Sequence, residues 1–134
     1  MHQIGEVAEA VELSLRTIRH YEEVDLVPPS GRSAGGFRLY TDEDVERLRL
    51  VKRMKPLEFT LDEMSELLDL RDRLAAGAGA GAAGDHAELV GRLELFAAAA
   101  EQRCETLREQ LDAAQSMART LRREARRHRT PVQR

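Results

Sequence analysis

The chain has 134 residues, of which 42% are hydrophobic, 34% charged and 4% aromatic, and its formal net charge is −3. A chain of this length is predicted to form at most one compact domain plus an extension. Because it has few aromatic residues and no tryptophan, we do not expect a large independent core, so a partner must bury further apolar surface. The single cysteine excludes an intramolecular disulfide, and no apolar run is long enough for a secretory signal or a membrane span, which predicts a cytoplasmic protein with no membrane partner.

Charge is divided unevenly along the chain. Residues 1–70 carry 9 Lys and Arg against 15 Asp and Glu, a net charge of −6, whereas residues 71–134 carry 12 against 9, a net charge of +3. An acidic N-terminal half argues against a nucleic-acid partner unless its basic side chains gather on one face. The candidates for such a face are Arg16, Arg19, Arg32, Arg38, Lys52, Arg53 and Lys55.

Two short helices are predicted first. The spacing of Ile4, Val7, Ala8 and Val11 is that of one apolar helix face, and Ser14 is a favoured N-cap for a second helix. The side chains expected to face inward are Leu15, Ile18 and Val24, and those expected to point outward are Arg16, Thr17, Arg19, His20 and Tyr21.

Residues 28–36 are expected to form a wing. This segment contains Pro28, Pro29 and three glycines. Because proline fixes φ and removes a backbone donor, while glycine permits positive φ, the segment does not continue the preceding helix.

The order of these pieces is the most specific signal in the chain. It contains Y-E-E-x-x-L-V-P-P after the second helix, R-x-x-x-G-F-R-L-Y in the wing, then T-D-E-D-V and L-E-F-T-L-D-E. The array resembles the MerR family of bacterial transcription regulators over roughly the first half of the chain. The resemblance implies a sequence-specific regulator that binds double-stranded promoter DNA as a homodimer on an inverted repeat and distorts it. RNA polymerase stays open as a further partner.

The resemblance also implies which residues bind DNA. Most of them are expected to anchor phosphates rather than read bases. They are Arg16, Thr17, Arg19, His20 and Tyr21 in the recognition helix, Arg32, Phe37, Arg38 and Tyr40 in the wing, and Lys55 beyond it. Asp25 and Glu58 stand where the family usually has glycine, and because Glu disfavours a left-handed backbone, a rearranged turn is expected at Glu58.

Two further helices complete the predicted DNA-binding domain, which we call the head. Thr41 and Thr60 are expected N-caps, each with an acidic partner three residues later. The first of these helices should end near Lys55, before Pro56. The apolar stripe of the second consists of Leu61, Met64, Leu67 and Leu68. These elements predict a mainly α fold with a winged helix-turn-helix DNA-binding domain over residues 1–72 and a flexible Ala/Gly-rich linker over residues 73–84.

A long dimerisation helix is predicted over residues 85–128, followed by a short basic tail over residues 129–134. Apolar and small residues recur in the helix with alternating steps of three and four, which indicates a coiled coil. The resemblance implies antiparallel pairing with a second copy. Residues expected at the interface are Leu93, Phe96, Ala97, Ala100, Cys104, Leu107, Leu111, Ala114, Ala118 and Leu121.

Cys104 has two interpretations. On the coiled-coil seam it is expected to pack as a small hydrophobic residue. Antiparallel pairing would also bring it close to its counterpart, so redox sensing stays open. Metal-sensing relatives bind their ions through groups of cysteines, and drug-sensing relatives carry a separate ligand domain. We find neither feature in the sequence. The sequence therefore predicts no metal, no cofactor and a short member of the family without a C-terminal effector domain.

An enzymatic function is not expected. The sequence has no nucleophile elbow, phosphate-binding loop or paired carboxylates in a recognisable pocket pattern. Two alternatives to a regulator stay open. One is an architectural DNA-binding protein without an effector, and the other is a coiled-coil interaction adaptor, which the acidic N-terminal half suggests.

Overall fold

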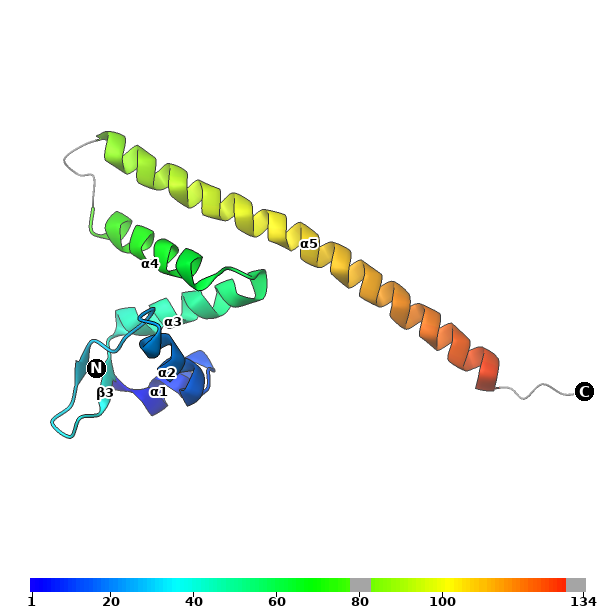
Figure 1. Cartoon of the computed structure of the whole chain (residues 1–134), viewed down its shortest axis with the longest axis horizontal. Helices are drawn as coiled ribbons and strands as arrows, with labels where there is room; N and C mark the ends of the chain where they lie inside the picture. The colour runs from blue at the N-terminus through cyan, green and yellow to red at the C-terminus, as the bar shows by residue number, and fades with distance from the viewer. Residues whose placement is uncertain (78–82, 130–134) are drawn as a thin grey trace, which may run out of the picture. The chain divides into compact units, whose positions relative to one another are not determined.

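The computed structural model describes residues 1–77 and 83–129 of a mainly helical chain (Figure 1). It divides into two units, Met1–Phe96 and Ala97–Arg134. Its elements are β1 (His2–Gln3), α1 (Ile4–Val11), α2 (Leu15–Glu23), β2 (Gly31–Arg32), β3 (Arg38–Tyr40), α3 (Asp42–Met54), the 3-10 helix η1 (Lys55–Leu57), α4 (Leu61–Ala75) and α5 (Ala83–Arg129).

Side-chain caps begin three of the helices. The Ser14 hydroxyl accepts a hydrogen bond from the backbone N–H of Thr17 at 3.1 Å at the start of α2. Thr41 and Thr60 form reciprocal capping boxes at the starts of α3 and α4. These caps satisfy backbone donors that have no partner inside a helix, and they confirm the predicted starts.

Within residues 1–77 and 83–129, three residues other than glycine adopt a left-handed backbone. Glu12, Asp25 and Glu58 have φ values of 56°, 57° and 61°. The rearrangement expected at Glu58 is therefore not observed, because this residue keeps the conformation that glycine would take. Its N–H donates to the carbonyl of Lys55 at 2.9 Å, and buried Phe59 follows directly. The hydrogen bond and the burial of Phe59 hold Glu58 in this conformation, which its residue type disfavours.

A small antiparallel sheet forms the wing. The strand order is β1-β3-β2, with His2 opposite Tyr40 and Gly31 opposite Leu39. Gly36 has a φ of 82° at the tip, where the Ser33 N–H donates to the carbonyl of Phe37 at 2.9 Å. The sequence predicted the hairpin but not β1, whose partner strand lies far along the chain.

The interior of the Met1–Phe96 unit is built mainly from side chains of α1, α2, α3 and α4, together with residues of the wing and of the turn before it. Leu15 and Val24 are each 39% exposed, so their predicted inward orientation is wrong. Leu26 and Val27 are buried in their place, because the left-handed Asp25 turns the chain back toward the core. Among the described residues, the largest fully buried side chains are those of Val7, Ile18, Val27, Tyr40, Leu48, Val51 and Leu70.

The first turns of α5 belong to the Met1–Phe96 unit. Leu89 is buried, Arg92 pairs with Glu66 at 2.8 Å, and the rings of Phe59 and Phe96 lie 6.1 Å apart between centroids. The sequence placed Phe96 only at the dimer interface and gave Leu89 no role. Both residues contribute to the packing of the head within one chain.

The α5 helix has 47 residues, which corresponds to about 70 Å. Helical structure extends into both ends of the predicted linker, since α4 continues to Ala75 and α5 begins at Ala83. Residues 78–82 of that linker and residues 130–134 of the predicted basic tail lie outside the described residues. None of the helices in residues 1–77 and 83–129 combines the length and apolarity needed to cross a bilayer.

Candidate nucleic-acid interface

The outward face of α2 carries the first group of predicted DNA contacts. Arg16, Arg19 and His20 are exposed, as the sequence predicted. Thr17 is half-buried, and its hydroxyl lies 2.8 Å from that of Ser14, so it supports the helix start. The two arginines and the histidine offer hydrogen-bond donors that suit phosphates and base edges.

Tyr21 and Tyr40 are core residues and do not point outward. Tyr21 is 3% exposed and Tyr40 is 0% exposed, and burial raises the pKa of both phenols. The orientation predicted for Tyr21 is wrong because it lies three residues after buried Ile18 on the same helix face. The N–H groups of Leu26 and Val27 also donate to its carbonyl, at 2.9 and 3.1 Å, and fold the chain over that face.

The Tyr40 hydroxyl is an unusual buried group. Within the described residues no hydrogen-bond partner reaches it. Because the whole side chain is enclosed, the direct DNA contact predicted for Tyr40 does not fit its position in this conformation. Tyr40 instead closes the base of the wing, where β3 pairs with β1.

Both arginines of the wing are paired with one carboxylate. Arg38 Nε donates to Glu22 Oε2 at 2.5 Å, and Arg32 Nη2 donates to Glu22 Oε1 at 3.2 Å. Arg32 Nη1 also donates to the carbonyl of Gly36 at 3.2 Å. The hydrogen bond to Glu22 raises the pKa of Arg38, although burial acts in the opposite direction. Sequence reasoning missed Glu22, although it stands in the Y-E-E motif.

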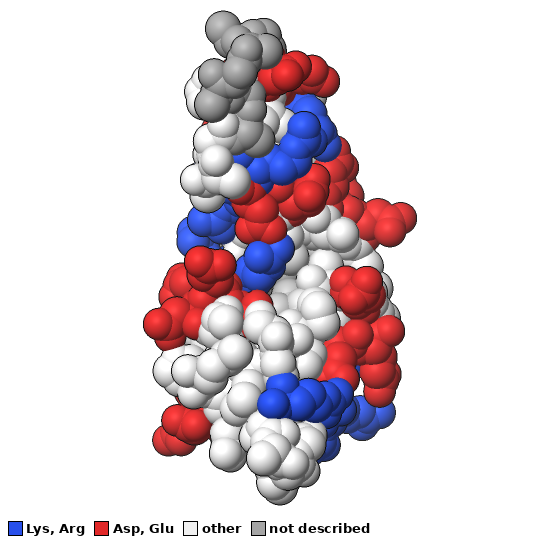
Figure 2. Space-filling model, turned by 90° about the vertical axis from the view of Figure 1, so that its left-hand side faces the viewer, with Lys and Arg blue, Asp and Glu red and all other residues white. Residues whose placement is uncertain are grey.

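The tip of the wing is apolar. Phe37 is 66% exposed, and a Cβ at Gly35 would lie 3.1 Å from its ring. In Figure 2, pale uncharged atoms form the lower end of the face, and a compact group of Lys and Arg atoms lies just above them beside Asp and Glu atoms. Basic and acidic groups alternate over the described part of this face, which therefore carries no continuous basic surface.

The basic side chains at the end of α3 and the start of η1 are also divided. Lys52 Nζ donates to the carbonyls of Val11 and Glu12 at 2.9 and 3.3 Å, so it caps the end of α1. Arg53 and Lys55 are exposed. The structure therefore leaves some of the candidates for a basic face open to solvent and ties the others to the protein. The open group is Arg16, Arg19, Arg53 and Lys55, and the tied group is Arg32, Arg38 and Lys52.

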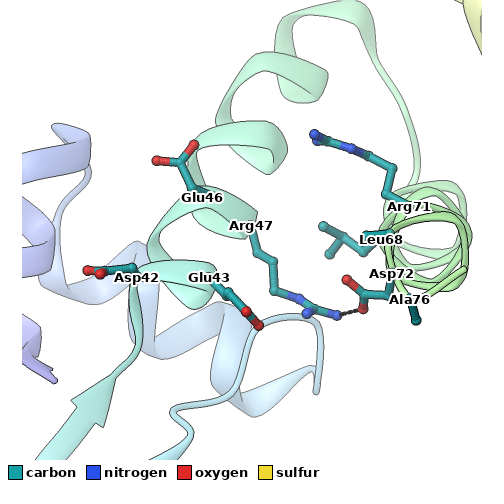
Figure 3. Close-up of a pocket in the computed structure, with 9 residues that line it drawn as sticks. Asp42, Glu43, Glu46, Arg47, Leu68, Arg71, Asp72 and Ala76 are labelled. Carbon is teal, nitrogen blue, oxygen red and sulfur yellow. Dashed lines mark hydrogen bonds and ion pairs between the residues drawn. The ribbon is translucent and has the colours of Figure 1, made fainter.

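A cleft of about 730 Å³ lies between α3 and α4 (Figure 3). Arg47 reaches across it to pair with Asp72, and Leu68 and Ala76 supply apolar lining. Asp42, Glu43 and Glu46 add carboxylates from α3. This lining disfavours phosphate, so the cleft does not extend the nucleic-acid interface.

Cys104 is a free, half-buried thiol of α5. Over residues 1–77 and 83–129, His, Cys, Asp and Glu side chains form no group of three or more suited to a metal ion. The described part of the molecule thus offers Cys104 no neighbouring ligand set of its own.

Comparisons with known proteins agree on one family. Residues 3–70 match the family model described as MerR HTH family regulatory protein. The transcriptional regulator ZntR of Escherichia coli K12 is 41% identical over 71 residues, which are 53% of this chain and 50% of ZntR. TipA of Streptomyces coelicolor, a transcriptional activator, is 37% identical over 107 residues, which are 78% of this chain and 41% of TipA.

Solved structures show the same fold. The N-terminal part of the Bacillus subtilis multidrug transporter activator, MtaN, superposes with a TM-score of 0.56 at 30% identity, over 92% of this chain and 97% of MtaN. HiNmlR, a MerR family regulator lacking the sensor domain and bound to promoter DNA, gives a TM-score of 0.64 at 20% identity, over 93% of this chain and 92% of HiNmlR.

The chain spans half or less of the length of ZntR and TipA. The shared region contains α1, α2, the wing, α3 and most of α4, in the order that the motifs of the sequence indicated. With its family match over residues 3–70, the chain belongs to the MerR family of helix-turn-helix regulatory proteins.

Proposed function

We propose that this chain binds promoter DNA as a transcriptional regulator. The observation that carries the proposal is the exposure of Arg16, Arg19 and His20 on one side of α2, with a winged hairpin tied to the same helix. A helix of this kind reads the major groove while a wing anchors on phosphates. ZntR and TipA are named as transcriptional regulators, and HiNmlR is described as bound to promoter DNA, which supports the assignment.

We propose further that the active form is a homodimer. Leu107, Leu111 and Leu121 of the coiled-coil seam are between 41% and 55% exposed in the single chain. A second copy offers the same seam, and antiparallel pairing about a midpoint near Cys104 would cover both sets of leucines. Cys104 would then pack close to its counterpart.

A twofold dimer matches a DNA site made of two inverted half-sites. Two heads held by a stiff coil would bend or untwist DNA whose half-sites are not spaced to fit them. Residues 1–72 would supply the DNA contacts and residues 85–128 the pairing. The names of the relatives favour regulation of transcription over catalysis. Binding to bacterial promoter DNA would place the protein in the cytoplasm.

The test is selection of bound fragments from genomic DNA, followed by footprinting and binding measurements. Arg16→Ala and Arg19→Ala should each weaken binding to a selected fragment at least tenfold, because each removes a charged donor aimed at the groove. Arg71→Ala, in the acidic cleft between α3 and α4, is the matched control and should bind within twofold of the wild type. Unaltered binding in both α2 variants would refute the proposed interface.

A further inference from the structure

Glu22 joins the recognition helix to strands β2 and β3 of the wing. It lies in the last turn of α2, and its two carboxylate oxygens accept hydrogen bonds from Arg32 of β2 and Arg38 of β3. The side chain of Glu22 is only 21% exposed, compared with 28% for Arg38 and 50% for Arg32. One partly buried carboxylate therefore fixes the position of two guanidinium groups relative to α2.

We propose that Glu22 is a positioning residue that determines how strongly the protein prefers its operator over other DNA. The inference rests on the proposed function and deepens it. Glu22 acts through Arg32 and Arg38 and touches no DNA itself. It has two separate effects: the effect on charge weakens sequence-independent binding, and the effect on geometry favours the operator over random sequence.

The first effect is electrostatic. Non-specific binding depends on how many phosphates the protein neutralises, and each contact adds about 0.9 to the slope of log K against log salt. Two guanidinium groups paired with one carboxylate present a net charge of +1 in place of +2. Glu22 thus lowers the attraction of the wing for any duplex, in a head whose residues 1–70 already carry −6.

The second effect is geometric. Specific binding needs the side chains of α2 at the base edges and the wing at the phosphates at the same time. Glu22 binds Arg38 through Nε, so the two Nη groups can approach a phosphate without loss of that hydrogen bond. The link from Arg32 to the carbonyl of Gly36 extends the same restraint to the tip of the hairpin. A restrained wing favours the one register in which both sets of contacts form.

The experiment compares Glu22→Gln with Glu23→Gln in the full chain. Glu23 is the adjacent, exposed residue of α2, so both variants lose the same charge in almost the same place. Two probes are used: a fragment selected by the wild type and a random-sequence duplex of equal length. For Glu22→Gln we expect the ratio of the two affinities to fall at least tenfold and the salt slope on random duplex to steepen by about one. Glu23→Gln should keep the ratio within threefold of the wild type.

The route through the wing is tested by adding Arg32→Gln and Arg38→Gln together. If Glu22 acts through these two arginines, Glu22→Gln in that background should change the ratio less than threefold, and a larger change would overturn the inference. An unchanged or increased ratio for Glu22→Gln, or an equal fall for Glu23→Gln, would overturn the inference. Failure of the wild type to prefer any selected fragment would instead overturn the proposed function, and this inference with it.

A second measurement needs no variant of Glu22. In the free wild-type protein, the Nε–H of Arg38 should exchange with water at least tenfold more slowly than that of exposed Arg16, as followed by NMR. Equal exchange rates would show that the carboxylate does not hold Arg38 and would overturn the inference even if Glu22→Gln did not fold.

Discussion

Lys52 of α3 donates a hydrogen bond from its ammonium group to the backbone carbonyl of Val11 at 2.9 Å. This carbonyl is among the last of α1, where helix acceptors have no partner inside the helix. The same ammonium lies 3.7 Å from the carboxylate of Glu12. A side chain that the sequence assigned to DNA phosphates therefore ties α3 to the end of α1.

Lys52→Met should destabilise the protein by about 1 kcal/mol. A hydrogen bond to a charged group contributes about 1.5 to 3 kcal/mol, and we reduce that figure because the Lys52 side chain is 40% exposed. The measurement is the free energy of unfolding in urea at fixed protein concentration. Lys55→Met, a change of the same kind at an exposed residue, is the control and should change stability by less than about 0.5 kcal/mol.

Glu58→Gly should stabilise the protein by about 0.5 to 1 kcal/mol. Relief of the left-handed strain contributes about 1 to 2 kcal/mol, and the greater freedom of glycine in the unfolded chain offsets part of it. Asp25→Gly should stabilise the protein by a smaller amount, because Asp tolerates a left-handed backbone better than Glu.

The control for this prediction is Glu46→Gly, within the α3 helix. That change should cost about 1 kcal/mol, since it adds the same freedom at a residue without strain. Destabilisation by Glu58→Gly of the same size as the control would contradict the account of the turn.

Tyr40→Phe should leave stability unchanged or raise it by about 1 kcal/mol. The hydroxyl is buried, and no partner within the described residues accepts or donates to it, so its removal relieves the cost of taking a polar group out of water. DNA affinity should stay within twofold of the wild type. A large loss of affinity in this variant would mean that Tyr40 leaves the core to contact DNA.

Asp42 should titrate at a lower pH than an ordinary aspartate. His2 Nε2 lies 2.5 Å from Asp42 Oδ1, and the hydrogen bond from His2 lowers the pKa of Asp42. The stabilisation from this pair is complete above the ordinary pKa of Asp, about 3.9, and is lost as the pH falls through the lowered value. In His2→Ala, carboxyl NMR should show Asp42 titrating near the ordinary value, and an unchanged titration would contradict the assignment.

Leu107→Glu should convert the proposed dimer into monomers at micromolar concentration. Each protomer of the dimer would then bury a carboxylate without a partner on the seam, which costs free energy twice. Analytical ultracentrifugation gives the result directly. Leu95→Glu is the matched control, because Leu95 lies in the same helix but off the seam and is 71% exposed. Equal dissociation in both variants would argue against the seam.

The sequence predicted the features of this fold that depend on near neighbours. Ser14, Thr41 and Thr60 begin helices through hydrogen bonds to residues three positions later, so a short window of sequence contains the whole interaction. The alternating spacing of apolar residues likewise revealed the long α5 helix.

Features that depend on distant neighbours were missed. The inward orientation predicted for Leu15 and Val24 is wrong, since both are 39% exposed, because burial depends on how whole elements pack and not only on spacing within one helix. The pairing of Glu22 with Arg38 joins residues 16 positions apart, and the pairing of Glu66 with Arg92 joins residues 26 positions apart. No local pattern marks a basic side chain as already engaged by a carboxylate.

The α5 helix begins among the side chains of the head, where Leu89 is buried and Arg92 binds Glu66, and it continues without a break into the seam. Folding of the head and association of two copies would consequently be thermodynamically linked, since ordering the first turns of the helix favours the rest. The melting temperature should then rise with protein concentration. A cell that makes more of the protein would then have more molecules and also a larger folded fraction of them. The occupancy of DNA would therefore rise more steeply than the rate of synthesis.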